Sequence, residues 1–379
     1  MSKKIHSILL FFALLFANLT CVTSQLSSDE APSHFTSATP KLKIAFYTQG
    51  LLVRGTEVAV YDYADFNETL LGNESFIIYL PNHRVENFGP DNPITVKDHF
   101  SARFKDRFFE CSSLHEMDEI LLKEKIDILY VIKSGQIDGK ESKVIKNAIH
   151  AVFPPLQVHG DIYASVSEWL SLENPALNVP FVPHMIRLDE TAETLHEELG
   201  IPHGSVVFGR HGGVDTFDIP FAQDLVVELA LAKRDWYFIF LNTRQFCHLP
   251  NVIFLPSTPD IIYKTKFINT CDAMIHARYM GESFGLACGE FSIKNKPVIT
   301  WTGSYGYHRS HIDILKDKGF YYSNKNELRN VLLNCGNNIE TIRGTSWDAY
   351  SEKYSPEVVM KKFDQVFIQP LTKHLDQSP

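Results

Sequence analysis

Several features that would assign a function directly are missing from this sequence. Its 379 residues contain no C-x-x-C pair, no Cys/His cluster and no G-x-G-x-x-G after a predicted strand. A zinc site, a disulfide framework and a nicotinamide dehydrogenase are therefore not supported. No basic block is present either, and 36 Lys and Arg against 45 Asp and Glu give a formal charge of −9. A surface of that sign repels phosphate backbones, so we expect no nucleic-acid partner.

The composition is that of an ordinary globular protein, with 44% hydrophobic and 21% charged residues. Such a composition excludes a disordered chain and a coiled coil. A chain of this length is expected to form about two domains, each with a core of its own.

The amino terminus predicts entry into the secretory pathway. Residues 1–24 begin with a positive charge, continue with an apolar stretch and end in small residues, as a signal peptide or a retained signal anchor does. The apolar stretch is short for a membrane span, which needs ~20 apolar residues, and any membrane association would involve residues 5–22. Asn67 and Asn73 begin glycosylation sequons, which fits a lumenal, secreted or signal-anchored protein. The six cysteines have no close spacing and predict buried free thiols, which argues against a secretory protein with disulfides.

Short β-rich apolar runs alternate with amphipathic stretches from residue 42 onward, with one break at Glu173–Pro183, where three prolines occur. Strands that are apolar on both faces are typical of parallel sheets covered by helices. Two successive series of this kind predict an α/β fold of two Rossmann-like doubly wound domains with a cleft between them. Ser355-Pro356-Glu357 predicts the start of a C-terminal helix.

We expect five segments after the leader. They are a flexible lead-in over 25–40, an N-terminal Rossmann-like domain over 41–172, a linker over 173–188, a C-terminal Rossmann-like domain over 189–345, and a C-terminal helix and tail over 346–379.

The stretch from Ala273 to Trp301 carries the strongest chemical signal. A predicted strand is followed by a loop with Glu282 and then by a helix that carries Glu290, eight positions further on. Gly285 opens this helix, whose unpaired N–H groups can hold an anion such as a diphosphate. Each carboxylate can accept hydrogen bonds from paired hydroxyls, one pair from a sugar and one from a ribose. For two glutamates alone, a solvent-exposed helix face with a capping acid is the commoner explanation.

The residues around these glutamates change that interpretation. The segment E-S-F-G-L-A-C-G-E over residues 282–290, followed by K-P-V-I-T, resembles the E-x7-E signature of the family-4 retaining glycosyltransferases, which have the two-Rossmann GT-B fold. V-F-G-R over residues 207–210 resembles the strand and Gly-Arg that open the donor site of that family. The resemblance covers residues 160–335 well and residues 42–160 weakly.

The resemblance implies a role for each matching residue. Glu282 would bind the hydroxyls of the donor sugar, Glu290 would bind the ribose, and Arg210 would neutralise the diphosphate. The sugar and the diphosphate would also face the backbone of Phe284, Gly285 and Leu286.

Two further candidates lie in the first domain. Gly55 belongs to a glycine loop after the first strand, which faces the cleft in the resembling enzymes and would contact the donor here, although a plain strand-to-helix connection explains it as well. His159 precedes the last strand of this domain, where a histidine could touch the donor sugar or act as an acid or base. A solvent-facing or core histidine is the more common case.

The sequence departs from the family pattern at one position. The lysine that usually follows the arginine by about five positions is absent from residues 211–218. Backbone N–H groups at Gly212 and Gly213, or the side chain of Arg278, could attract the diphosphate instead. Arg278 could equally pair with Glu282 and only balance its charge.

The resemblance implies a retaining glycosyltransferase that holds a nucleotide-sugar donor on its second domain and a glycan, lipid or protein acceptor on its first. No Asp-x-Asp triplet occurs, so we expect neither the metal–diphosphate bridge of the other major glycosyltransferase fold nor another cofactor. A nucleotide-sugar 2-epimerase, which resembles the same fold, is an alternative. The missing lysine also leaves open a catalytically silent nucleotide- or carbohydrate-binding protein.

Overall fold

The structure is a computed structural model that describes residues 41–82, 96–303 and 308–372. The leader, its membrane contact and the lead-in, all predicted within residues 1–40, lie outside the described residues. In the part of the chain that is described, no helix combines the length and the apolar character needed to cross a bilayer. Entry into the secretory pathway remains a prediction.

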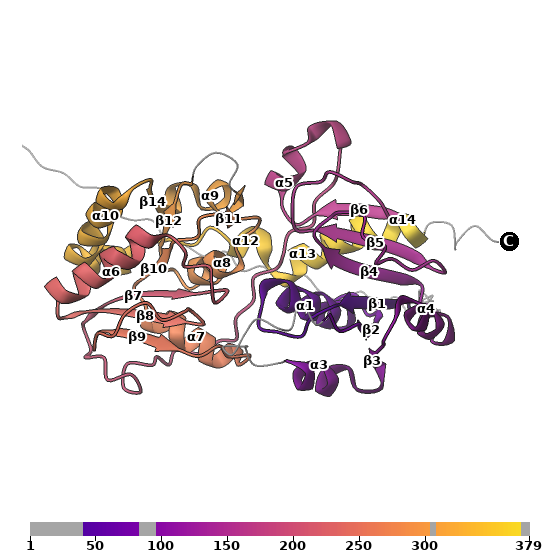
Figure 1. The fold of residues 1–379 in the computed structure, drawn as a ribbon, viewed down its shortest axis with the longest axis horizontal. Coiled ribbons are helices and arrows are strands. Elements are labelled where there is room, and N and C mark those ends of the chain that lie inside the picture. The colour runs from indigo at the N-terminus through magenta and orange to yellow at the C-terminus, as the bar shows by residue number, and fades with distance from the viewer. Residues whose placement is uncertain (1–40, 83–95, 304–307, 373–379) are drawn as a thin grey trace, which may run out of the picture. The chain divides into compact units, whose positions relative to one another are not determined.

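Two parallel sheets of six strands each form the framework of the described chain (Figure 1). The first sheet contains β1 (Lys43–Thr48), β2 (Glu74–Tyr79), β3 (Phe108–Glu110), β4 (Ile128–Lys133), β5 (Lys146–Ala151) and β6 (Ile162–Ser165). The second sheet contains β7 (Val206–His211), β8 (Trp236–Leu241), β9 (Val252–Leu255), β10 (Ala273–His276), β12 (Val298–Trp301) and β14 (Gly319–Tyr322). A separate pair is formed by β11 (Gly281–Glu282) and β13 (His308–Arg309).

Both large sheets have the same strand order. It is β3-β2-β1-β4-β5-β6 in the first sheet and β9-β8-β7-β10-β12-β14 in the second, and neighbouring strands are parallel. This is the order of a doubly wound Rossmann fold, in which the direction of strand addition reverses in the middle of the sheet. The predicted fold class of two Rossmann-like domains is therefore confirmed.

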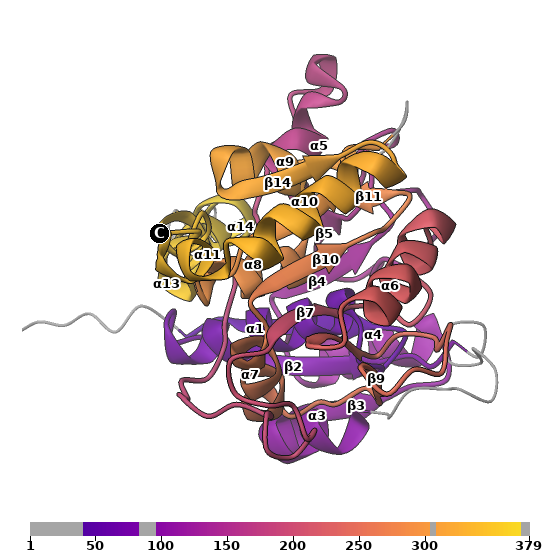
Figure 2. The same cartoon turned by 90° about the vertical axis from the view of Figure 1, so that its left-hand side faces the viewer.

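Helices connect the strands and cover both faces of each sheet. The first domain contains α1 (Gly55–Thr69), α3 (Lys97–Phe104), η1 (Lys105–Arg107), α4 (Leu114–Lys123), α5 (Glu168–Leu172) and η2 (Pro175–Leu177). The second contains α6 (Pro220–Ala232), α7 (Ile261–Thr270), α8 (Leu286–Ile293), α9 (Ser310–Leu315), η3 (Lys316–Lys318), α10 (Lys325–Asn337) and α11 (Ile339–Gly344). The helices α6 and α10 lie on one face of the second sheet, and α7 and α8 lie on the other (Figure 2). Apolar residues of each pair bury the face that it covers.

Apolar residues on both faces explain why the central strands form where the sequence predicts them. All six residues of β7 are buried, as are five of the six residues in β1 and in β2. The sequence analysis does not predict β3 and β14, which lie at the outer edges of their sheets. No residue of β3 and only one of β14 is fully buried. Edge strands this short have too weak an apolar pattern to be recognised from sequence.

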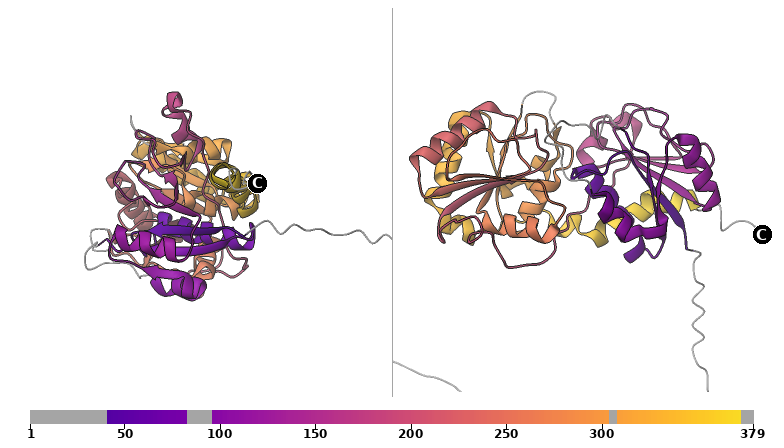
Figure 3. Two further views of the ribbon diagram at one scale, coloured as in Figure 1. Left: turned by 90° about the vertical axis from the view of Figure 1, so that its right-hand side faces the viewer. Right: turned by 60° about the horizontal axis from the view of Figure 1, so that its bottom comes forward.

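The chain ends with α12 (Ser351–Tyr354), α13 (Pro356–Phe363), η4 (Asp364–Ile368) and α14 (Gln369–Thr372). The start of α13 matches the predicted signal, because the Ser355 hydroxyl accepts a hydrogen bond from the Val358 N–H and Pro356 is the first helical residue. This terminal segment lies along the first sheet, although it follows the second domain in the chain (Figure 3). Its residues in the core of the first sheet are Val359, Met360, Phe363, Phe367 and Ile368.

One predicted glycosylation sequon is buried. Asn67 is fully inaccessible, and its amide group donates a hydrogen bond to the Ser75 hydroxyl at 2.9 Å. A glycan at this nitrogen is incompatible with the folded packing. The five described cysteines are all free and four of them are buried, as predicted.

Phe363 tests the packing of the C-terminal helix. Its side chain is 1% exposed and stacks on Tyr63 with 5.1 Å between ring centroids. We expect Phe363→Ala to lower the free energy of unfolding by about 3–5 kcal/mol, the cost of deleting a buried aromatic ring. Val358 lies on the same helix but is 45% exposed, so Val358→Ala should change this free energy by no more than about 0.5 kcal/mol. Urea denaturation measures both, and equal effects would contradict the packing.

Candidate functional site

The candidate residues converge on the centre of the second sheet. Arg210 lies at the carboxyl end of β7, and Arg278 and Glu282 follow the neighbouring strand β10. These two strands flank the point where the strand order reverses. Loops that leave such a point diverge to opposite faces of the sheet and leave a crevice for a ligand.

A cavity of about 410 Å³ is present there, within the usual range for small-molecule sites. It is lined by loops of the second domain and by α1 and neighbouring residues of the first. Of the nine candidate site residues, all except His159 line this cavity. They are Gly55, Arg210, Arg278, Glu282, Phe284, Gly285, Leu286 and Glu290.

Glu282 is held by two partners, one on each carboxylate oxygen. The His276 Nε2 atom is 3.1 Å from Oε1, and Arg278 donates to Oε2 at 2.6 Å. Burial by itself would raise the pKa of Glu282, but Arg278 and His276 outweigh it and lower the pKa to about 2. The carboxylate is therefore ionised at neutral pH and can only accept hydrogen bonds.

Glu290 is held in a similar way by partners from two other elements. It is 5% exposed, the His211 Nε2 atom is 2.9 Å from Oε2, and the Lys264 ammonium group contacts Oε1. Burial opposes ionisation here too, but Lys264 and His211 bring the pKa down to about 2. Both predicted carboxylates are thus present in the cavity as anions.

Arg210 is a buried cation that forms no ion pair with a carboxylate in the described part of the chain. It is 2% exposed, and its guanidinium group donates to four neutral oxygens. These are the carbonyls of Asn242 and Gly213 and the hydroxyls of Thr243 and Thr216. Burial lowers the pKa of Arg210 to about 10, so the group stays charged at neutral pH. Among the described residues no carboxylate forms an ion pair with it, and a buried charge in this state favours an anionic ligand.

Two helix amino termini approach each other beside this cation. Gly285 adopts a left-handed conformation with φ +95° and directly precedes α8, while Gly55 is the first residue of α1. A Cβ atom on Gly55 would lie 3.4 Å from Cδ1 of Leu286. The residues that precede the two helices, Arg54 and Gly285, make no side-chain capping hydrogen bond. Their free N–H groups and positive dipole ends therefore both face the cavity, as an anion-binding site requires.

Lys264 is a functional candidate that the sequence analysis misses. It lies in the first two turns of α7 and lines the cavity beside Glu290. No spacing motif marks this position, because Lys264 comes from a different element than Glu290 and reaches it only in three dimensions. The predicted alternatives at Gly212, Gly213 and Arg278 also line the cavity, and Arg278 is paired with Glu282.

The structure does not bring His159 to the site. Its Nδ1 atom is 2.6 Å from the Gln157 carbonyl and its Nε2 atom is 3.3 Å from Glu141. The physical reason is topological: His159 precedes β6 and so lies at the amino end of that strand, whereas ligands of such sheets bind at the carboxyl ends. We leave His159 out of the site.

Gly281–Gly285 reads G-E-S-F-G, which formally matches the G-x-S-x-G pattern of a hydrolase nucleophile elbow. A nucleophilic serine needs a base within hydrogen-bond reach. In the described part of the chain no histidine forms a hydrogen bond with Ser283. Within Gly281–Gly285 only the two glycines have a positive φ, so Ser283 does not have the strained backbone of a nucleophile elbow. The elbow geometry is therefore not formed.

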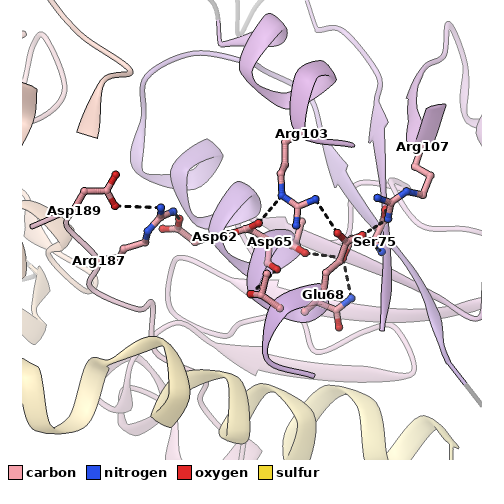
Figure 4. A network of polar contacts seen from close by, with 11 residues as sticks. Asp62, Asp65, Glu68, Ser75, Arg103, Arg107, Arg187 and Asp189 are labelled. Atoms are coloured by element: carbon pink, nitrogen blue, oxygen red, sulfur yellow. Dashed lines mark hydrogen bonds and ion pairs between the residues drawn. The ribbon is translucent and has the colours of Figure 1, made fainter. Parts of the chain in front are cut away.

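Asp62 is a second residue that the sequence analysis misses. It lies on α1, lines the cavity, and is 6% exposed. The next acids of the same helix, Asp65 and Glu68, are bound by Arg103 (Figure 4). The nearest cation to Asp62 is Arg187 at 3.8 Å, too far for a hydrogen bond. Burial raises the pKa of Asp62 to about 7, although Arg187 opposes the shift.

Within the described ranges, no group of three or more His, Cys, Asp or Glu side chains is arranged to hold a metal ion.

No protein-family model matches the chain, and no curated protein matches its sequence. Solved structures match it in fold. A glycosyltransferase from Rickettsia africae has a TM-score of 0.65 at 15% identity, over 90% of this chain and 100% of that one. Anabaena Alr3699/HepE in complex with UDP-glucose has a TM-score of 0.58 at 13% identity, over 89% and 100%. A putative UDP-N-acetylglucosamine 2-epimerase from Listeria monocytogenes has a TM-score of 0.56 at 13% identity, over 90% and 98%.

At these identities the similarity establishes the fold and nothing finer. The chain has a glycosyltransferase-like GT-B structure, as the resemblance predicts. Membership of the family-4 retaining enzymes remains a prediction.

The raised pKa of Asp62 predicts how stability depends on pH. Between the ordinary aspartate value of 3.8 and about 7, the folded protein retains a proton that the unfolded chain has released, so stability falls as pH rises through this window. Asn cannot ionise. We therefore expect Asp62→Asn to become more stable than the wild type at pH 8, with a relative gain from pH 4 to pH 8 of about 2–4 kcal/mol.

Urea denaturation at a series of pH values measures this gain. Asp65→Asn is the matched control on the same helix, because it breaks the contact with Arg103 and should lower stability at pH 7. A constant difference between wild type and Asp62→Asn from pH 4 to pH 8 would contradict the assigned environment of Asp62.

Proposed function

We propose that the protein is a retaining glycosyltransferase that transfers a sugar from a nucleotide-sugar donor to a hydroxyl acceptor. The observation that carries the proposal is the buried Arg210, which has no ion pair among the described residues and lies at the same cavity as two helix amino termini. This combination suits a diphosphate, which has two charges and several acceptor oxygens. Glu282 precedes the amino terminus of α8 and Glu290 follows it, and both line the same cavity.

The proposed donor spans the cavity along α8. The sugar hydroxyls bind to Glu282, and the diphosphate binds to Arg210 and to the N–H groups at Gly285 and Leu286. The ribose hydroxyls bind to Glu290. Lys264, which already contacts Glu290, can extend its ammonium group to the diphosphate and take the role of the lysine that is missing after Arg210.

The chemical step then depends on stabilising the leaving group. The bond from the anomeric carbon to the diphosphate oxygen breaks, and the acceptor oxygen bonds to the same carbon. The acceptor proton passes to the departing diphosphate, whose new negative charge is stabilised by Arg210 and by the helix termini. The cavity wall formed by the first domain leaves the acceptor facing the sugar. No side chain is assigned as nucleophile or base.

A nucleotide-sugar 2-epimerase is the second candidate, and the fold similarity to the Listeria protein favours it. An epimerase needs no acceptor. Incubation of the protein with each nucleotide-sugar alone, followed by product analysis, separates the two reactions. An epimerised nucleotide-sugar without an added acceptor would support the epimerase.

Binding of nucleotides tests the proposed site. We expect at least one of UDP, GDP and ADP, or of their hexose esters, to raise the melting temperature of the wild-type protein. Arg210→Gln removes the cation and should weaken binding of both the free nucleotide and its ester by about 10- to 100-fold. Arg329→Gln, which removes an exposed arginine on α10, is the control and should bind as the wild type does.

Glu282→Gln tests the sugar end of the same site. Glu282 is proposed to contact the sugar alone, so the substitution should leave the affinity for the free nucleotide within about threefold of wild type. It should lower transfer by at least about 100-fold, because a charge-assisted contact to the reacting sugar is lost. Calorimetry and a transfer assay measure the two effects. Near-normal transfer by Glu282→Gln would remove this assignment.

A further inference from the structure

A row of buried polar side chains extends from Glu282 away from the cavity. His276 contacts the Glu282 carboxylate through Nε2, as described above. Its other ring nitrogen, Nδ1, is 2.8 Å from the Thr300 hydroxyl, and this hydroxyl is 2.9 Å from Nε2 of His311. Thr300 and His311 are fully buried, and neither lines the cavity. The nucleotide-sugar proposal assigns no role to these groups.

The ionised carboxylate sets the direction of the first hydrogen bond in this row. Glu282 can only accept, so His276 donates to it from Nε2–H. With one proton on the ring, Nδ1 has a lone pair, to which the Thr300 hydroxyl donates while it accepts from Nε2–H of His311; Thr300 Oγ1 also lies 3.5 Å from the Trp301 carbonyl. Burial holds the pKa of His311 well below its ordinary value, so this ring is neutral and its Nδ1 carries a lone pair. That Nδ1 atom is buried and has no hydrogen-bond partner in the described structure.

Two backbone features tie the far end of the row to the site. Glu282 in β11 pairs with Arg309 in β13, and His311 follows two residues later at the start of α9. Gly285 lies against His311, since a Cβ atom at this glycine would be 3.0 Å from the His311 Cβ. A shift of His311 would therefore displace both Glu282 and the amino terminus of α8.

We propose that Thr300 and His311 are positioning residues that lock His276 in its Nε2–H form and so orient Glu282 for the ligand. His276 and Arg278 each use one lone pair on a different carboxylate oxygen. Glu282 lines the cavity, so its remaining lone pairs can accept from a group that presents hydroxyl or N–H donors. The identity of that group, the donor sugar, rests on the proposed function, whereas the row itself does not.

The Thr300 hydroxyl is the link that can be removed without touching the cavity. Without it, His276 is free to carry its proton on Nδ1 and would turn a lone pair toward Glu282. Two lone pairs repel, so the carboxylate would rotate or lose this partner. Val matches the shape of Thr but has no hydroxyl, and Ser keeps the hydroxyl, so Thr300→Val and Thr300→Ser form a matched pair.

The first measurement needs no ligand. Nitrogen-15 NMR of the histidine rings in the full-length protein reports which nitrogen carries the proton in His276 and His311. We expect both rings in the Nε2–H form in the wild type and in Thr300→Ser. In Thr300→Val we expect His276 to shift toward the Nδ1–H form or toward a mixture. Identical ring spectra for folded Thr300→Val and wild type would overturn the proposal.

The second measurement uses UDP, GDP and ADP with UDP-glucose, GDP-mannose and ADP-glucose as probes. For the pair that binds, the ratio of the two dissociation constants gives the contribution of the sugar. Thr300→Val should lower this contribution about tenfold and leave the free nucleotide affinity within twofold, while Thr300→Ser should keep both near wild type. A purely structural role would weaken the free nucleotide equally and would overturn the proposal.

The two proposals can fail separately. If no probe binds the wild-type protein but the ring protons follow the expected pattern, the nucleotide-sugar function is wrong and the positioning row stands. If a probe binds but Thr300→Val leaves the ring protons and the sugar contribution unchanged, the site stands and the positioning row is wrong.

Discussion

Arg210 is the constraint on which the architecture of the site depends. Removing a guanidinium ion from water costs several kcal/mol, and among the described residues its hydrogen-bond acceptors are neutral carbonyl and hydroxyl oxygens. They fix the orientation of the group without cancelling its charge. The position of this charge at the cavity is thus a property of the folded protein. An arrangement of this kind does not have to reorganise when negative charge develops on a leaving group.

The acids of the site form their ion pairs with other cations. Glu282 pairs with Arg278 and Glu290 pairs with Lys264, although the charge of Glu282 still acts on Arg210 from a distance. The doubly wound topology explains how so many charges can meet, because adjacent strands β7 and β10 send their following loops to opposite faces of the sheet. The remaining face of the cavity is formed by α1, whose amino terminus adds a further positive end.

Local sequence information accounts for much of the fold and for one half of the site. The central strands, the start of α13 and the pair Glu282 and Glu290 are predictable because each depends on neighbouring residues, through apolar runs, capping residues or a fixed spacing. The edge strands β3 and β14 and the packing of α13 are not predictable, because they depend on surfaces formed by distant segments. The positions of Lys264 and Asp62 in the cavity also depend on distant segments and could not be predicted. His159 is close to β6 in sequence, but it precedes this strand and so lies at its amino end, whereas the ligand crevice is at the carboxyl ends.

The missing lysine concerns how a positive charge can reach a site from a part of the chain that is distant in sequence. A diphosphate site needs positive potential at a point, and any element that passes within reach can supply it. In this chain the loop after β7 has no lysine over residues 211–218, and α7 brings Lys264 to the cavity from another part of the chain. The lysine is held by Glu290 when no ligand is present, so its charge is positioned and not free to leave for solvent. Under the proposed function Lys264 supplies by another route the cation that the motif describes, and the absence of the motif lysine then does not favour a silent binding protein.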